Sequence, residues 1–180
     1  MQIANSKITV RPTKVYFLKM EQRPAGSLSQ NPDVSFRVLP KPLDVDEYLN
    51  FYRSVGLKFN WLDRLFMKKE ELDKKINAHN VHIHIMSVRG EDAGFLELVE
   101  ETDHVELLYF GLYPSFIGKG YGKYFLDWSI QTAWAYNPKW IQLNTCELDH
   151  VNALPVYRKL GFKDYKTTIE DRRVLVEPIQ

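Results

Sequence analysis

The stretch best suited to chemistry is a glycine-rich loop, PSFIGKGYGKYF, at residues 114–125. It follows an apolar, strand-like run and opens a segment with helical periodicity. The first turn of a helix has free backbone N–H groups and the positive end of the helix dipole, and glycines let a phosphate approach that backbone closely. The loop therefore indicates a pyrophosphate site made mainly of backbone amides, to which Lys119 and Lys123 add positive charge.

Two familiar phosphate motifs do not fit this loop. A P-loop needs four residues between its first glycine and its Gly-Lys pair, and then Ser or Thr. A dinucleotide-binding loop that used Gly118 and Gly120 would need a third glycine at position 123, which is Lys. A purely structural turn remains the alternative.

A pair of glutamates in a predicted hairpin is the second candidate for chemistry. If the turn ETD is centred between residues 101 and 102, residues whose numbers sum to 203 face each other, so Glu97 lies opposite Glu106. Opposed like charges on a half-buried face would raise the pKa of one carboxyl and suit it to act as a base. The alternative is that this end of the hairpin is solvated and both carboxyls are inert.

The hydrophobic pattern predicts an α+β scaffold for these residues. Strands are expected at 7–20, 34–39, 81–88, 93–100, 104–114 and 138–148, with one or two more within 162–176. Helices are expected at 44–56, within 60–80, at 122–136 and at 151–161. The first two strands would form a hairpin with a long connection, and a central antiparallel meander would lead into a strand–loop–helix–strand unit.

The composition is typical of an ordinary soluble protein. Hydrophobic residues make up 44% and charged residues 26% of the 180, and the formal net charge is +1, which does not favour nucleic acid or an anionic membrane as partner. Cys146 is the only cysteine, so no intramolecular disulfide is expected. Without a signal-like start or an apolar run of roughly 20 residues, we expect one domain over residues 1–180 in the cytoplasm.

Two segments together resemble the signatures of the GNAT acetyltransferases. ELLYFGLYPSFIGKGYGKYFL is similar to the family's acetyl-coenzyme A (acetyl-CoA) signature, Arg/Gln-x-x-Gly-x-Gly/Ala at the start of a helix, with Ile117 in its first position. HVNALPVYRKLGF is similar to the family's Asn-x-x-Ala-x-x-x-Tyr-x-x-x-Gly-Phe helix, with His150 in its first position. The matching residues are Gly120, Gly122, Ala153, Tyr157, Gly161 and Phe162.

The resemblance runs from about residue 44 to 165 and implies the GNAT fold, a mixed and mostly antiparallel sheet flanked by helices. It implies N-terminal strands in 1–40, acceptor-side helices in 44–80 and an acetyl-CoA-binding core in 81–165. Within the family the chain resembles a bacterial subset whose acceptors are mostly unassigned, and it departs from that subset at Asn144, where His is usual.

The same resemblance implies direct transfer of an acetyl group from acetyl-CoA to a primary amine in a ternary complex. The strand that ends at Leu112 would splay from its neighbour to hold the pantetheine arm, and the Leu112 amide would polarise the thioester carbonyl. Tyr157 would be the general acid and Glu106 the base; Tyr157 could also be a packing residue with a polar tip. The residues implied for the cosubstrate are Phe110, Gly111, Leu112, Gly118, Lys119, Gly120, Tyr121, Gly122, Lys123 and Asn152.

The acceptor, a small-molecule or peptide amine, would meet the two N-terminal helices and the loop GLKFNWLDR, which wall the cleft in this family. Aromatic candidates for that wall are Tyr48, Tyr52, Phe59 and Trp61, and each could equally be helix core. Asp63 could meet a positive charge, and Glu97 could help to bind a cationic acceptor. A homodimer is a further expectation from the resemblance.

Two other features are expected to be structural. His82 and His84 share one strand face without a carboxylate or Cys at ligand spacing, so we expect no metal and place both on an edge or solvated face. Cys146 is expected to pack and not to carry an acyl group. The rival function is a non-catalytic acyl-CoA-binding sensor or interaction module, which needs the glycine loop but neither Tyr157 nor a base.

Overall fold

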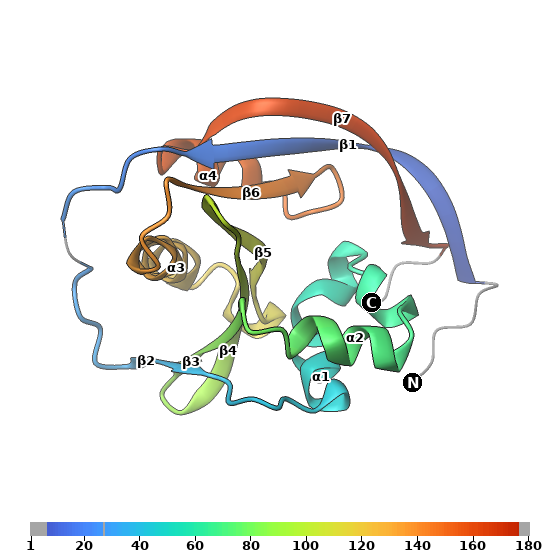
Figure 1. Ribbon diagram of the computed structural model, residues 1–180, viewed down its shortest axis with the longest axis horizontal. Helices are drawn as coiled ribbons and strands as arrows, with labels where there is room; N and C mark the ends of the chain where they lie inside the picture. Colours follow the sequence, from blue (N-terminus) through green and yellow to red (C-terminus); the bar gives the residue numbers. More distant parts are fainter. Residues whose placement is uncertain (1–6, 27, 177–180) are drawn as a thin grey trace.

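The computed structural model describes residues 7–26 and 28–176, which build one curved seven-stranded sheet with helices on both faces (Figure 1). The strand order is β2-β3-β4-β5-β6-β1-β7, and only β5 and β6 are parallel neighbours. The strands are β1 (Ile8–Met20), β2 (Val34–Val38), β3 (Val81–Val88), β4 (Glu91–Glu100), β5 (His104–Leu112), β6 (Trp140–Cys146) and β7 (Lys163–Leu175). The helices are α1 (Val45–Gly56), α2 (Lys69–Ile76), α3 (Tyr121–Ala135) and α4 (Ala153–Lys159), with short 3-10 turns at Leu57–Phe59, Asp63–Phe66 and Pro114–Phe116.

This arrangement confirms the α+β class and the central β3–β4–β5 meander, but the N-terminal hairpin is wrong. β1 lies between β6 and β7, whereas β2 pairs with β3 at the opposite edge of the sheet. Residues 21–26 and 28–33, which lie between them in the sequence, run down one side of the molecule (Figure 1). β1 pairs with β6 on one side and β7 on the other, and local sequence does not say which strands a given strand will pair with.

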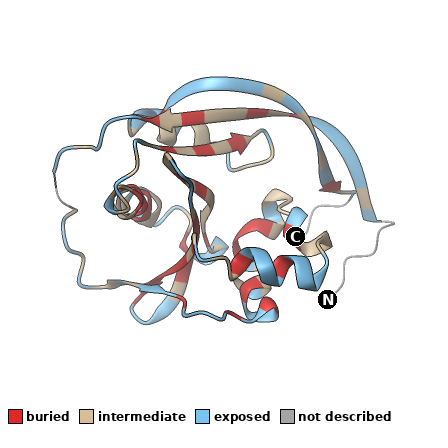
Figure 2. Ribbon diagram, viewed as in Figure 1, coloured by how far each residue is buried: buried red, intermediate tan, exposed pale blue. Residues whose placement is uncertain are grey.

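Two helical layers cover the sheet, and each buries its own apolar cluster (Figure 2). The expected stripe of α3 is buried at Phe125, Leu126, Ser129, Ile130 and Ala133, while Trp134 is only half-buried. On the other face α1 begins after Asp44, whose carboxylate accepts from the amides of Asp46 and Glu47 as a helix cap. Among the described residues, no helix has the length and apolar character that crossing a membrane requires.

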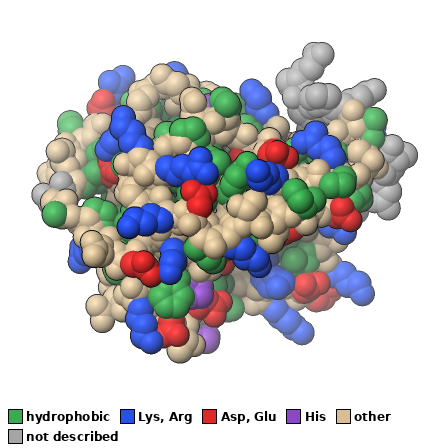
Figure 3. Space-filling model, turned by 90° about the horizontal axis from the view of Figure 1, so that it is seen from above, with side chains coloured by type: hydrophobic (Ala, Val, Ile, Leu, Met, Phe, Trp, Pro, Cys, Tyr) green, Lys and Arg blue, Asp and Glu red, His purple; other side chains and the backbone are tan. Residues whose placement is uncertain are grey.

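The strands β1 and β7 form a long ribbon that extends past the rest of the sheet. β6 pairs with β1 only from Val15 onward, so residues 8–14 and 169–175 pair with each other alone. This outer half arches over the side of the molecule that carries α1 and α2 (Figure 1), and its backbone is fastened there because the Leu175 amide donates to Asn60 Oδ1 at 2.8 Å. Seen from above, Lys and Arg side chains are interspersed with acidic and apolar ones (Figure 3).

A buried ion pair joins the sheet to the turn Asp63–Phe66. Glu97 of β4 is fully buried, and its carboxylate accepts from Arg64 Nη2 at 2.7 Å and from the Tyr48 hydroxyl at 2.6 Å. Removing one partner of such a pair leaves an uncompensated charge inside the protein. The turn Asp63–Phe66 and helix α1 are therefore tied to the middle of β4 by charge as well as by packing.

We predict that Arg64→Met alone lowers the free energy of unfolding by about 3–5 kcal/mol, because the buried Glu97 carboxyl then loses its cationic partner. Adding Glu97→Leu should recover most of this loss. Urea unfolding of the two variants and the wild type measures both effects. A single variant as stable as the wild type would contradict the ion-pair assignment.

The expectation of a solvated face is wrong for His84. β3 is an interior strand, and His84 lies beneath α3 with its ring 5.3 Å from that of Trp128. Burial, aided by the neighbouring His82, lowers the pKa of His84 to about 4. Within the described ranges, no group of three or more His, Cys, Asp or Glu side chains could hold a metal ion.

We predict that His84 makes the protein acid-sensitive. The unfolded chain takes up this proton near pH 6.5, whereas the folded chain does so only near pH 4. The unfolding free energy should therefore fall as the pH drops from 6.5 towards 4, by an amount that His84→Leu reduces by roughly 2–3 kcal/mol. Parallel pH curves for the two proteins, measured by urea unfolding, would contradict the prediction.

Candidate active site

The register between β4 and β5 differs from the predicted one. The Glu101 amide donates to the His104 carbonyl at 2.8 Å, so the turn is centred one residue later than expected. Val99 then faces Glu106, and Glu97 faces Tyr109. The predicted pairing of the two glutamates is wrong because a small shift of a hairpin turn changes every cross-strand partner.

Glu97 also lies outside the site. Its carboxylate is enclosed by Arg64 and Tyr48, so the expectation that it binds a cationic acceptor fails in this structure. Burial raises the pKa of both Glu97 and Glu106. A raised carboxyl pKa is confirmed, but its main cause is burial and not repulsion between the two groups.

The central feature of the site is the point where β5 leaves β6. The two strands pair only from His104–Trp140 to Leu107–Leu143. Leu108 is an extra residue in β5, since the pairs with β4 jump from Leu98–Leu107 to Glu97–Tyr109. Such a bulge bends a strand and increases its twist, so the predicted splay lies immediately after it.

The backbone of β5 beyond the bulge faces the gap. The Tyr113 amide donates to the Ala93 carbonyl at 2.9 Å. Because hydrogen-bonded and non-hydrogen-bonded pairs alternate in an antiparallel ladder, the Leu112 N–H points away from β4. At Gly111 a Cβ would lie 2.5 Å from Val55 Cγ1, so this glycine serves the close approach of α1, and the bulge is at Leu108 instead.

The glycine loop ends β5 and opens α3. Gly118 and Gly120 have φ values of 80° and 86°, which L side chains rarely adopt. Gly120 is the N-terminal cap residue, no side chain makes a capping hydrogen bond there, and the first turn has no acidic residue. The first-turn amides are thus left without the side-chain partners that usually satisfy them.

A cavity of about 500 Å³ connects these features. Of the predicted site residues, its walls contain Tyr52, Trp61, Asp63, Phe110, Gly111, Leu112, Gly118, Gly122, Lys123, Asn152 and Tyr157. Its walls do not contain Glu97, Glu106, Lys119, Gly120 or Tyr121. Phe59 and Cys146 also line it, whereas Tyr48 is in the core beneath.

Trp61 is held in the cavity wall from two sides. A Cβ on Gly56 would lie 2.2 Å from the Trp61 ring, so only glycine lets the indole fold over the end of α1. On the other side Trp61 Nε1 donates to Asp149 Oδ1 at 3.2 Å. Asp149 is itself fixed by the Thr145 hydroxyl at 2.7 Å and the Cys146 amide at 2.9 Å.

Tyr157 of α4 reaches the cavity beside Asp149. Burial, together with the negative charge of Asp149, raises the pKa of the Tyr157 phenol. The phenol therefore keeps its proton at neutral pH.

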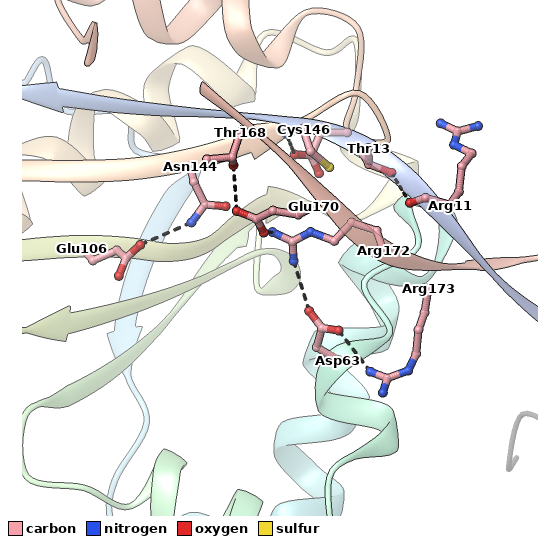
Figure 4. A network of polar contacts seen from close by, with 11 residues as sticks. Arg11, Thr13, Asp63, Glu106, Asn144, Cys146, Thr168, Glu170, Arg172 and Arg173 are labelled. Carbon is pink, nitrogen blue, oxygen red and sulfur yellow. Dashed lines mark hydrogen bonds and ion pairs between the residues drawn. The ribbon is translucent and has the colours of Figure 1, made fainter. Parts of the chain in front are cut away.

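Glu106 lies just behind the wall on β5. Its carboxylate accepts from Asn144 Nδ2 at 3.3 Å (Figure 4), and Asn144 does line the cavity.

Several residues of the cavity wall were not found by sequence reasoning, among them four with polar or charged side chains: Tyr109, Asp149, Arg172 and Arg173. The bulge changes the side to which Tyr109 points, and no local pattern predicts that bulge. Asp149 is in the β6–α4 connection, where a short acidic residue before a helix was the available signal. Arg172 and Arg173 come from β7, far along the chain, and Asp63 pairs with them at 3.3 and 3.5 Å.

Several solved structures have a similar fold and are distant in sequence. A GCN5-related N-acetyltransferase from Sphaerobacter thermophilus is 12% identical with a TM-score of 0.66, and the match covers 94% of this chain and 54% of that one. A functionally unknown conserved protein from Staphylococcus epidermidis is 16% identical with a TM-score of 0.62, covering 94% and 64%. An IAA acetyltransferase from Bacillus cereus is 17% identical with a TM-score of 0.56, covering 74% and 79%.

The chain thus spans only 54% and 64% of the first two of these structures. No curated protein matches it in sequence. A family model described as the acetyltransferase (GNAT) domain matches residues 52–179, a range that contains every residue lining the cavity. The match covers most of the sequence and all of the site, and the chain therefore belongs to the GNAT acetyltransferase family.

Proposed function

We propose that this protein is an acetyl-CoA-dependent N-acetyltransferase that moves an acetyl group directly to a primary amine in a ternary complex. One observation carries the proposal: the uncapped start of α3, the free backbone edge of β5 and the side chain of Tyr157 all meet at one cavity. The thioester supplies the activated acetyl group. The chain's own residues would hold the cosubstrate, polarise the thioester carbonyl and protonate the departing thiolate.

The pyrophosphate is proposed to bind the amides of Gly118 to Lys123 at the start of α3. The positive φ values of Gly118 and Gly120 shape this turn, and nothing lies within 4 Å of the position where a Cβ would stand on either. Backbone therefore forms the surface of the cradle. Lys123 is already paired with Asp127 at 2.5 Å, so its charge is a secondary contribution.

The pantetheine arm and the thioester carbonyl are proposed to lie along β5 in the gap that β6 leaves open. The Leu112 N–H points into this gap and can donate to the carbonyl oxygen as negative charge develops there. A donor fixed in a strand is already oriented before the reaction, which makes its stabilisation of that charge effective.

Tyr157 is proposed to protonate the departing thiolate. Its raised pKa keeps the phenol protonated until that moment, and its place in the wall with Gly111 and Leu112 puts it at the same gap. The arriving ammonium must first lose a proton. Glu106 is the proposed base, acting through a water molecule because it lies behind Asn144 and not in the wall itself.

For Tyr157→Phe we predict a fall in kcat of about 100-fold or more, the usual size of a general-acid contribution. Affinity for coenzyme A, measured by calorimetry, should not change. Tyr124→Phe, a half-buried tyrosine of α3 outside the cavity wall, is the matched control. Thiol release from acetyl-CoA with a panel of amines measures the effect. If the panel stays silent in the wild type while coenzyme A binds tightly, the sensor function is favoured.

For Glu106→Gln we predict loss of the acidic limb of the pH–rate profile. The base must be deprotonated, so the wild-type rate should rise with pH through a pKa that burial has raised above the ordinary glutamate value of about 4.3. Glu101→Gln, an exposed change at the start of the adjacent turn, should leave the profile intact. Wild-type turnover in Glu106→Gln would remove Glu106 as the base.

A further inference from the structure

We infer that the amine acceptor carries a carboxylate, which Arg172 and Arg173 bind at the end of the cavity beneath the β1–β7 ribbon. The inference rests on the proposed acetyl transfer and specifies its substrate class. It depends on which charged groups face the cavity and on how far each is already paired.

The carboxylates that line this end of the cavity are already engaged. Asp149 accepts from the Trp61 indole, the Thr145 hydroxyl and the Cys146 amide. Asp63 is bridged by both arginines, at 3.3 Å to Arg172 Nη1 and 3.5 Å to Arg173 Nη1. Neither group is a free partner for a cationic acceptor.

The arginines, by contrast, have donors to spare. A guanidinium has five N–H groups. Arg172 uses Nη1 on Asp63 and Nη2 on Glu170 at 2.9 Å, and each of these two nitrogens carries a second N–H group, whereas its Nε is enclosed and out of reach of a ligand. Arg173 makes one ion pair and its side chain is 50% exposed. The groups of this wall that still have free hydrogen-bonding capacity are therefore cationic donors. An anionic oxygen group is the matching acceptor.

The position of Arg172 is set before any ligand arrives. Asp63 holds it from the 3-10 turn, and Glu170 holds it from its own strand, where Glu170 also accepts from the Thr168 hydroxyl at 2.9 Å (Figure 4). Figure 4 shows Arg172 directed along the sheet towards Asn144, whereas Arg11, its ladder partner on β1, points away. A guanidinium fixed in this way loses little side-chain freedom on binding.

A planar guanidinium matches a carboxylate in shape and charge. The aromatic rings of Trp61 and Tyr109, whose centroids lie 5.1 Å apart, could cover the apolar part of such an acceptor. Its amine would then lie near Asn144, with Glu106 behind. A diamine of the same length would place a second positive charge against the arginines.

The test uses sets of acceptors that differ only at one end. The acids are ω-amino acids of increasing length, from glycine to 6-aminohexanoate, and the common α-amino acids. Each acid is compared with its carboxamide and, where one exists, with the diamine of equal length. We expect at least one acid to exceed its carboxamide by roughly tenfold or more in kcat/KM, the effect of one charge-assisted hydrogen-bonded contact. Diamines should be the poorest substrates.

Variants connect this preference to the arginines. Arg172→Gln should reduce the acid-to-carboxamide ratio to near one, and Arg172→Lys should keep part of it because the charge remains. Arg11→Gln, on the neighbouring strand and directed away from the cavity, should keep the full ratio. Thermal unfolding and calorimetry with coenzyme A show whether each variant is folded with an intact cosubstrate site.

The outcomes separate this inference from the function on which it rests. Amines acetylated without preference for the acid, or with diamines preferred, overturn the carboxylate inference alone. A ratio unchanged in a folded Arg172→Gln also overturns it. A protein that binds acetyl-CoA but acetylates none of these amines overturns both the inference and the enzymatic proposal.

Discussion

The site depends on the separation of two neighbouring strands. β5 and β6 are parallel partners up to Leu107 and Leu143, and the extra residue Leu108 then bends β5 away. Without that separation the backbone groups of β5 beyond Leu108 would be used up in the sheet. The separation leaves them facing a cavity, and the same strand leads directly into the glycine turn that opens α3. One backbone irregularity thus provides both open space and free backbone donors at the place where we propose that the cosubstrate binds.

The rest of the molecule holds that opening in place from both sides. On one face α3 buries Phe125 and Leu126 against the sheet. On the other face α1 packs onto Gly111, and the Arg64–Glu97 ion pair ties the 3-10 turn to β4. The β1–β7 ribbon forms the remaining wall of the cavity. Its backbone is fastened where the Leu175 amide donates to Asn60, and its side chains Arg172 and Arg173 pair with Asp63. The walls of the cavity therefore combine residues that lie far apart in the sequence, from Tyr52 to Arg173.

Features that depend on neighbouring residues could be predicted from the sequence, whereas features that depend on contacts between distant segments could not. The Asp44 cap, the glycine turn and the start of α3 involve neighbouring residues, and the structure agrees with the sequence at each. The partners of β1 and the proximity of Arg172 to Asp63 depend on contacts between distant segments, for which one sequence contains no local signal. The Glu97–Glu106 register shows a third limit. Its two strands were predicted close to their observed positions, but a turn shifted by one residue and a bulge at Leu108 changed the partners.

The most direct test of the account compares coenzyme A with pantetheine by calorimetry on the purified protein. Both ligands carry the arm that would lie along β5, but only coenzyme A has the diphosphate that the amides at the start of α3 would hold. The account predicts saturable heat with coenzyme A and much weaker or undetectable binding of pantetheine. Equal affinity for the two ligands, or no heat with either, would contradict it.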